Sequence, residues 1–431
     1  MTSTPKIKPA SPSGKKKEKV LLEEQDYFHG MLCKEDVEEM LLKKGDFIVW
    51  MMDGEGLKDV SITNQTNDEN EKEKCTINNE KYGSVPELVE KYVQKKKKLD
   101  PKNDNSIPIT PIHRFPWEIA HENVTLSKDK LGEGQFGTVF KGTIKIEART
   151  IDVAVKTAKA TTEKQEIENV LKEAKMMRNY QHPHVIKMYG VALQKDPLMI
   201  IMEFIDGQAL NKFLEEAKDS DKPPTEEEKL EKMILPSAWG LEYLHFKKCI
   251  HRDIAARNVL YSKSGVAKIC DFGLSRQGVS YKNMDDQTSI PWRWVAPECY
   301  KTDTYDALSD VWAFGWLAWE VYTFAYSLPY GPYTRAEMME VFKGEFCKDL
   351  KARFPSETPP QIAEIFMENV FVPHKERKNM TEVCKLLEKE TKLAVCRDNV
   401  KLRKPAKPVV SMESVKKVSN KKAELRKTRT R

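Results

Sequence analysis

The chain has 431 residues, of which 40% are hydrophobic and 32% charged; this is enough apolar material for more than one core and excludes a wholly disordered chain. Its formal charge of +6 gathers at the ends: residues 400–431 hold twelve Lys or Arg against two Glu. That distribution argues against a folded nucleic-acid-binding surface, so no nucleic acid partner is expected. The eight cysteines include no C-x-x-C pair and no secretory signal is recognisable, so a cytoplasmic protein is expected.

Both ends of the chain are basic and rich in Lys, Ser and Pro. Residues 1–25 and 396–431 are therefore expected to be disordered tails. Two interpretations remain open for them. The tails are either solvated without a partner, or attracted to an anionic membrane surface or an acidic protein, an attraction that salt would weaken. The second interpretation would place the protein peripherally at the plasma membrane.

Residues 26–98 are expected to form a small α+β domain. Val37, Met40 and Leu41 recur at helical spacing, residues 47–50 and 60–63 are typical of strands, and a second helical stripe surrounds Leu88. Residues 100–116 contain four prolines. We therefore expect residues 99–120 to be a linker.

Residues 121–395 are expected to form one larger domain with two lobes. Residues 125–157 are β-rich, and the pattern beyond residue 207 is mostly helical. Between them lies an amphipathic helix with apolar positions at Ile167, Val170, Leu171, Ala174 and Met177. Residues 311–326 are mostly apolar but include Glu320, and they are too few to span a membrane, so a buried helix is expected there.

The first motif of this domain that indicates a chemical function is a glycine-rich run. Gly132, Gly134, Gly137 and Val139 form a G-x-G-x-x-G-x-V pattern, in which glycine lets the backbone approach phosphate oxygens closely. A dinucleotide-binding loop has the same glycines, but its third glycine opens a helix. Here the residues after Gly137 continue as a strand, which favours a loop that binds the phosphates of a nucleoside triphosphate.

A lysine in a strand follows the glycine run. Lys156 ends the sequence VAVK, where an ammonium can hold the phosphates of a nucleotide. A half-buried ammonium needs a carboxylate to fix its position. Glu173 lies on the following helix and is the expected partner.

Three further motifs come in a fixed order. Residues 251–258 read HRDIAARN, residues 271–273 read DFG and residues 296–298 read APE. Together with the glycine run and the strand lysine, they resemble the protein kinases. The resemblance implies an α+β fold with the bilobal kinase architecture, in which a small β-rich N-lobe precedes a larger helical C-lobe.

The resemblance also implies ATP and Mg²⁺ as cofactors and gives roles to residues. Asp253 would orient the substrate hydroxyl or accept its proton, while Asn258 and Asp271 would bind Mg²⁺. Met202 would gate the pocket behind adenine, and backbone groups of Glu203 and Ile205 would bind the adenine edge. The remaining positions expected to contact ATP, besides the glycines and Lys156, are Leu131, Val139 and Ala154. His251 and Phe272 would serve packing, and Asp310 would hold the catalytic loop.

Two local features resemble tyrosine kinases rather than serine/threonine kinases. Ala255 and Arg257 replace the lysine that serine/threonine kinases carry after the catalytic aspartate. Pro291 and Trp294 resemble the tyrosine kinase platform for a longer phenol. Tyr281 stands where the family has its activating phosphotyrosine, whose phosphate could pair with Arg252; an ordinary exposed loop tyrosine is the alternative.

The first domain resembles an SH2 domain, since residues 27–30 read YFHG and residues 45–49 read GDFIV. With the kinase motifs, residues 26–395 resemble the Fes/Fer group of non-receptor tyrosine kinases, without that group's F-BAR and coiled-coil region. The position of the phosphotyrosine-binding arginine holds Trp50, whose indole has one donor and no charge. Lys34 could offer a weak contact. We therefore expect the SH2-like domain to bind an unphosphorylated protein partner or to pack on the kinase.

The predicted function is transfer of the ATP γ-phosphate to tyrosine hydroxyls of protein substrates. The alternative is a catalytically weak pseudokinase that acts as a scaffold through its SH2-like and kinase surfaces. The late part of the domain departs from the family pattern at Asn369, Val370 and Lys378, although Arg377 is kept and should pair with Glu298. These departures affect stability and docking, so the active enzyme is the preferred prediction.

Overall fold

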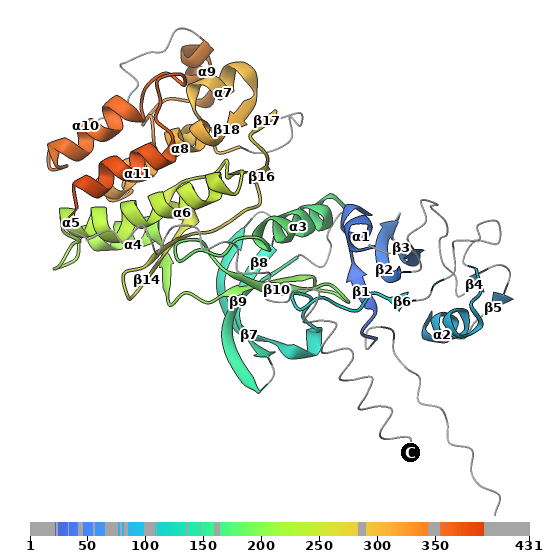
Figure 1. Ribbon diagram of the computed structural model, residues 1–431. Coiled ribbons are helices and arrows are strands. Elements are labelled where there is room, and N and C mark those ends of the chain that lie inside the picture. Colours follow the sequence, from blue (N-terminus) through green and yellow to red (C-terminus); the bar gives the residue numbers. More distant parts are fainter. Residues whose placement is uncertain are drawn as a thin grey trace, which may run out of the picture. The chain divides into compact units, whose positions relative to one another are not determined.

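The computed structural model describes residues 22, 25–32, 34–41, 46–54, 57–64, 76–77, 80–81, 85–98, 108, 110–134, 137–146, 148–158, 164–282, 290–343 and 354–391. Most of the two basic tails lies outside these residues. The chain divides into two compact units, Met1–Phe115 with Leu193–Lys195, and Pro116–Ala192 with Asp196–Arg431. Figure 1 shows the elements of both units in the colours of the sequence.

The first unit is an α+β module built around one central strand. Its elements are β1 (Phe28–Met31), α1 (Lys34–Met40), β2 (Asp46–Gly54), β3 (Leu57–Asn64), β4 (Thr76–Ile77), β5 (Glu80–Lys81), α2 (Val85–Lys95) and β6 (Thr110–Pro111). Strand β2 pairs with β1 and β6 in parallel and with β3 in antiparallel orientation. The order of helix, strands and helix is the one that the periodicity predicts.

Helix α2 covers one face of this sheet. Its buried positions recur at the spacing of one helical face and pack with apolar side chains of β1 and β2. They are Val85, Leu88, Val89 and Tyr92, which cluster with Phe28, Phe47 and Val49. Burial of each large side chain contributes about 1.5–3 kcal/mol, so this cluster contributes substantially to the stability of the unit.

The first unit extends further along the chain than the expected boundary at residue 98. Strand β6 lies inside the expected linker and pairs with β2. The guanidinium of Arg114 donates to the backbone carbonyls of Phe28, at 2.7 Å, and Gln25, at 2.8 Å. A proline-rich segment has no apolar periodicity, but its extended backbone can still pair with a sheet, which is why the described residues 110–115 belong to this unit.

The sheet of the second unit forms its N-terminal lobe. The strands β7 (Val124–Gly134), β8 (Gly137–Ile146), β9 (Arg149–Thr157), β10 (Met188–Ala192) and β11 (Met199–Glu203) are antiparallel in the order β10-β11-β9-β8-β7. Helix α3 (Lys164–Met177) buries Val170, Leu171, Ala174 and Met177. The predicted β-rich segment and its amphipathic helix are therefore confirmed.

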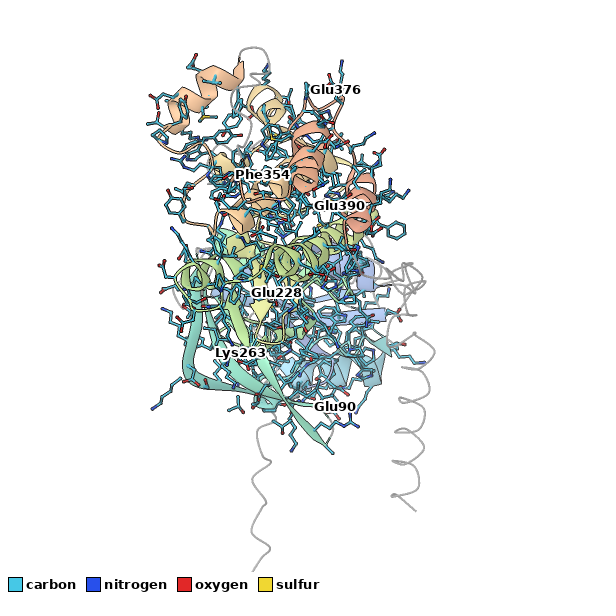
Figure 2. The ribbon with its side chains drawn as sticks, turned by 90° about the vertical axis from the view of Figure 1, so that its left-hand side faces the viewer. Glu90, Glu228, Lys263, Phe354, Glu376 and Glu390 are labelled. Atoms are coloured by element: carbon cyan, nitrogen blue, oxygen red, sulfur yellow. The ribbon has the colours of Figure 1, made fainter. Side chains whose placement is uncertain are left out.

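The C-terminal lobe of the second unit is mainly helical. Its helices are α4 (Leu210–Lys218), α5 (Glu226–Glu228), α6 (Leu235–Phe246), α7 (Pro297–Thr302), α8 (Ala307–Tyr322), α9 (Arg335–Lys343), α10 (Pro360–Asn369) and α11 (Met380–Lys389). Figure 2 labels Phe354, Glu376 and Glu390 on the segments around α10 and α11. Among the described residues, no helix has the length and apolar character that crossing a membrane requires.

Short strands connect these helices and carry the loops of the site. They are β12 (Gly207–Ala209), β13 (Cys249–Ile250), β14 (Val259–Ser262), β15 (Ala267–Ile269), β16 (Arg276–Gln277), β17 (Ser280–Lys282) and β18 (Thr304–Asp306). Helix α8 is buried along most of its length, as the apolar stretch predicts. It begins at a capping box in which the Asp306 carboxylate accepts from the backbone N–H of Leu308 and Ser309.

A buried arginine joins several segments of this lobe. The guanidinium of Arg377 pairs with both oxygens of Glu298, at 2.6 and 3.1 Å, as predicted. It also donates to the carbonyls of Val370 at 3.1 Å, Leu308 at 2.9 Å and Val372 at 3.1 Å. All five donors of the planar fork are thus used, which a lysine cannot reproduce.

Candidate active site

The glycine-rich hairpin lies between β7 and β8. Gly137 has a φ of +148°, and a Cβ atom added there would lie 2.1 Å from the carbonyl oxygen of Thr157. The fold itself therefore requires glycine at this position. At Gly132 an added Cβ would meet no described atom within 4 Å, so the protein has open space where a phosphate could approach. Gln135 and Phe136, at the tip, lie outside the described residues.

A buried ion pair lies behind this hairpin. The Lys156 ammonium on β9 donates to both carboxylate oxygens of Glu173 on α3, at 2.6 and 2.8 Å, and the two side chains are only 11% and 3% exposed. Burial would lower the pKa of Lys156, but Glu173 and Asp271 outweigh it and the pKa lies above its ordinary value. Lys156 is thus a fixed, permanently charged donor. The predicted pairing is confirmed.

The expected adenine-binding residues lie on neighbouring strands and the segment that follows. Val139 on β8 is opposite Lys156, and Ala154 on β9 is opposite Met202 on β11. Leu131 is 45% exposed on β7, and Ile205 follows β11. These positions come from strands that also carry the glycine hairpin and Lys156, as a nucleotide site requires.

Glu203 ends β11 and is held on both its backbone and its side chain. Its backbone N–H donates to the carbonyl of Lys187 at 2.9 Å, so its own carbonyl is the group that could accept from adenine. Its carboxylate accepts from Lys268 at 2.8 Å and from the backbone N–H of Lys187 at 2.7 Å. This second role of the side chain was not apparent in the sequence, because Lys268 lies 65 residues further along the chain.

The catalytic loop is fixed from below by Asp310 on α8. The Asp310 carboxylate accepts from the backbone N–H groups of His251, at 2.7 Å, and Arg252, at 2.8 Å. Asp253 then pairs with the guanidinium of Arg257. Burial raises the pKa of Asp253 above its ordinary value, although Arg257 and His251 oppose this change. A carboxylate with a raised pKa is better suited to accept a proton.

The two predicted metal ligands lie at the end of one hairpin. Strands β14 and β15 pair as a hairpin, with Asn258 directly before β14 and Cys270 directly after β15. The backbone N–H of Cys270 donates to the carbonyl of Asn258 at 2.9 Å, so Asp271, the next residue, lies close to Asn258. The Asn258 amide nitrogen donates to the Asp253 carbonyl at 2.8 Å. Its amide oxygen and the Asp271 carboxylate are then the kind of hard oxygen donors that Mg²⁺ prefers.

The phenyl ring of Phe272 packs between the two lobes of this unit. Its centroid lies 5.3 Å from the ring of Tyr180, which follows α3, and 5.2 Å from the ring of His251 in the catalytic loop. The packing role predicted for His251 and Phe272 is therefore found. It keeps Asp271, the neighbour of Phe272, close enough to Lys156 to raise the pKa of that lysine.

Tyr281 lies on β17, which pairs with β18. The Arg252 guanidinium lies 4.7 Å from the centre of the Tyr281 ring, and the Arg276 guanidinium lies 5.1 Å from it. Arg252 also lies 4.6 Å from the ring of Tyr305 on β18. The structure thus brings together the two residues for which a regulatory role is expected, and adds a second arginine.

Sequence reasoning missed the group that supports Arg257. The Arg257 guanidinium stacks on the Trp294 ring at 4.2 Å, and the Trp294 indole N–H donates to the Glu320 carboxylate at 3.2 Å. The signal was present, because Glu320 is a single carboxylate within a mostly apolar stretch. A buried carboxylate needs hydrogen-bond donors, but the sequence does not say which.

Comparisons with known proteins agree with this geometry. A family model described as protein tyrosine and serine/threonine kinase matches residues 125–387, and the chain therefore belongs to this family. The sheet-rich first lobe and the helical second lobe, predicted from the motifs, are those of its kinase domain. Members of the family use ATP and Mg²⁺ in general.

Several relatives are tyrosine kinases. The chain is 33% identical to human tyrosine-protein kinase Fer over 80% of its own length and 41% of that protein. It is 32% identical to Fer-related kinase 1 of Caenorhabditis elegans, over 79% of this chain and 87% of the relative. Spermatocyte protein spe-8 of Caenorhabditis briggsae is 38% identical over 69% of this chain and 58% of the relative. The chain thus spans less than half of Fer, and the comparisons support protein tyrosine kinase function.

Proposed function

We propose that the whole protein is an ATP-dependent tyrosine kinase of the Fes/Fer group, which phosphorylates tyrosine side chains of other proteins. The observation that carries this proposal is the formed Lys156–Glu173 pair together with the Asp253–Arg257 pair on a fully anchored catalytic loop. A pseudokinase has no need to keep all four of these groups in place. The active enzyme is therefore favoured over a scaffold.

Each residue has a defined task in this proposal. Lys156 holds the nucleotide phosphates, and the glycine hairpin covers them with backbone N–H groups. Asn258 and Asp271 would hold Mg²⁺, a hard cation that would supply compensating positive charge beside the nucleotide phosphates. Asp253 orients the tyrosine hydroxyl and accepts its proton as the oxygen attacks the γ-phosphorus and ADP leaves. Arg257 adds a cation close to the transferred group.

The specificity for tyrosine rests on how Arg257 is held. Its guanidinium lies over the Trp294 ring, 4.2 Å from the ring centre, and pairs with Asp253, the group proposed to orient the acceptor hydroxyl. This arrangement supports the tyrosine kinase interpretation of Ala255 and Arg257.

The activity test uses the purified chain with Mg²⁺-ATP and a mixed Glu/Tyr polymer, beside Asp253→Asn. We expect phosphotyrosine from the natural chain and a loss of about 100-fold or more in the variant, since a general base contributes 10²–10⁴-fold. Absence of phosphotyrosine, or equal amounts from both proteins, would overturn the proposal. A Glu/Ser polymer in a parallel reaction tests the choice of hydroxyl.

Phosphorylation of Tyr281 is proposed to increase activity. Burial, and then the neighbouring Arg276, lowers the pKa of the Arg252 guanidinium, so a phosphate placed near both cations would be attracted and would relieve their repulsion. We expect the natural chain to show a lag that preincubation with ATP removes. If Tyr281→Phe shows the same lag and the same final rate, Tyr281 has no such role.

The first unit is proposed to be an SH2-like domain that does not bind phosphotyrosine in the usual way. Trp50 is only 3% exposed, and Ile48 on the same face of β2 is fully buried, so the indole is buried rather than presented to solvent. A phosphate would meet an indole instead of a guanidinium fork. Titration of the Asp253→Asn variant of the full chain into a labelled phosphotyrosine peptide, followed by fluorescence anisotropy, tests this proposal. Micromolar binding that is lost after phosphatase treatment of the peptide would contradict it.

The protein is further proposed to be cytoplasmic, with a salt-dependent attraction of its basic ends to anionic membranes. The charge of residues 400–431 supports this proposal. Sedimentation with phosphatidylserine vesicles at low and high salt provides the measurement. Equal sedimentation with neutral vesicles would contradict it.

A further inference from the structure

Glu320 is a carboxylate in the middle of the apolar helix α8. The residue is 5% exposed, and its neighbours Trp319 and Val321 belong to a helix that is buried along most of its length. An ionisable group in such a place is strongly unfavourable unless donors meet it. The two donors that bind Glu320 come from the catalytic loop and from the segment before the APE motif.

One oxygen of Glu320 binds two different segments. Its Oε2 atom accepts from the backbone N–H of Ala256 at 2.9 Å and from the indole N–H of Trp294 at 3.2 Å. Ala256 belongs to the catalytic loop, between Asp253 and Arg257, and Trp294 ends the short helix Trp292–Trp294 before the APE motif. A single side chain thus joins the catalytic loop to the platform that receives the acceptor.

The same contacts continue to the reacting groups. The Arg257 guanidinium stacks on the ring of Trp294 at 4.2 Å and pairs with Asp253. The position of Arg257 is therefore determined on one side by Asp253 and on the other by a ring whose orientation depends on its hydrogen bond to Glu320. Movement of the indole would move the guanidinium, and through the ion pair it would move the carboxylate that orients the tyrosine hydroxyl.

We propose that Glu320 is a positioning residue for phosphoryl transfer to tyrosine, which fixes Arg257 and Asp253 through Ala256 and Trp294. The proposal rests on the proposed kinase function. Its requirement is an acceptor oxygen at this place rather than a negative charge, because both contacts are hydrogen bonds to neutral donors. Glutamine keeps such an oxygen, whereas leucine keeps the bulk and removes it.

The test compares Glu320→Gln and Glu320→Leu in the full chain by steady-state kinetics on the Glu/Tyr polymer. We expect Glu320→Leu to lower kcat by about 100-fold, since small misplacements of catalytic groups have effects of this size. Its affinity for a fluorescent ATP analogue should stay within about twofold of the natural chain, because Lys156 and Glu173 do not contact Glu320. Glu320→Gln should keep kcat within about threefold, as an acceptor of the same shape remains.

Two further variants keep the result interpretable. Trp294→Phe retains a ring against Arg257 but removes the indole donor, and we expect kcat to fall by about tenfold with the ATP analogue still bound. Glu364→Leu changes an exposed glutamate of α10 in the same lobe and should change neither quantity. If Glu320→Leu does not fold, the comparison of Trp294→Phe with the natural chain decides.

The outcomes separate the two claims. If the natural chain makes no phosphotyrosine, the proposed function fails and this inference fails with it. If the natural chain is active and both Glu320→Leu and Trp294→Phe keep kcat within about twofold, only the inference fails. Equal losses of kcat in Glu320→Gln and Glu320→Leu, in parallel with equal losses of ATP analogue binding, would show a merely structural role and would also overturn it.

Discussion

Replacing Arg377 by lysine should strongly destabilise the second unit. The guanidinium makes five hydrogen bonds, two to Glu298 and three to backbone carbonyls of Val370, Leu308 and Val372. An ammonium has three donors and no planar fork, so at least two of these acceptors lose their partner. Each buried orphan costs about 1–3 kcal/mol, which gives a loss of about 3 kcal/mol in the free energy of unfolding.

Urea unfolding, followed by tryptophan fluorescence, measures this loss as a lower midpoint with an unchanged slope. Lys378→Ala is the matched control, because Lys378 is the next residue, its side chain is 45% exposed, and its ion pair with Glu382 is 3.6 Å long. The control should shift the free energy by less than about 0.5 kcal/mol. A loss below about 1 kcal/mol for Arg377→Lys would refute the argument that the fork holds these segments together.

Three other predictions follow from the site. Gly137→Ala should lower the free energy of unfolding by more than about 1 kcal/mol, because its Cβ would lie 2.1 Å from the Thr157 carbonyl oxygen. Gly132→Ala should change the free energy of unfolding by less than about 0.5 kcal/mol but raise the KM for ATP. If the two variants lose the same amount of stability and show the same KM for ATP, this distinction between the two glycines is wrong. Lys156→Met should retain the fold yet reduce phosphotyrosine formation by about 100-fold or more; near-normal turnover would show that the pair with Glu173 is not catalytic. Burial raises the pKa of Glu320 to about 7, so the folded state keeps a proton that the unfolded state loses above its ordinary pKa of 4.5. From pH 5 to pH 8 the natural chain should therefore lose about 2.5 kcal/mol of stability relative to Glu320→Gln, measured by urea unfolding, and a constant difference would argue against a raised pKa.

The sequence could predict most of the phosphoryl-transfer site because its groups lie in short motifs with local geometry. Lys156 lies on a strand and Glu173 on a helix, and in the structure the Lys156 Nζ atom lies 2.6 Å from the Glu173 Oε2 atom. Asp253 and Arg257 are four residues apart in one loop and form an ion pair. The strand and the helical stripe could be predicted from local patterns, whereas the roles of Asp253 and Arg257 came from the resemblance of their motif to the protein kinases.

The remaining contacts join segments that lie far apart in the chain. The acceptor for Ala256 is Glu320, 64 residues away, and the partner of Glu203 is Lys268, 65 residues away. No periodicity relates such pairs. A carboxylate in an apolar stretch indicates that hydrogen-bond donors must lie near it, but only the folded structure shows which residues supply them. The extension of the first unit to residue 115 was missed for a related reason, since strand β6 is short and proline-rich and has no apolar pattern.

The two acids of α8 limit how the catalytic loop can change in length. Asp310 holds the backbone at His251 and Arg252, and Glu320 holds it at Ala256. On one helix, ten residues correspond to a rise of about 15 Å, and one added residue would rotate the second acid by about 100° relative to the first. Because both anchors bind backbone N–H groups, a substitution between residues 252 and 256 leaves these hydrogen bonds in place, whereas an insertion or deletion, in the loop or in the helix, would detach one end of the loop.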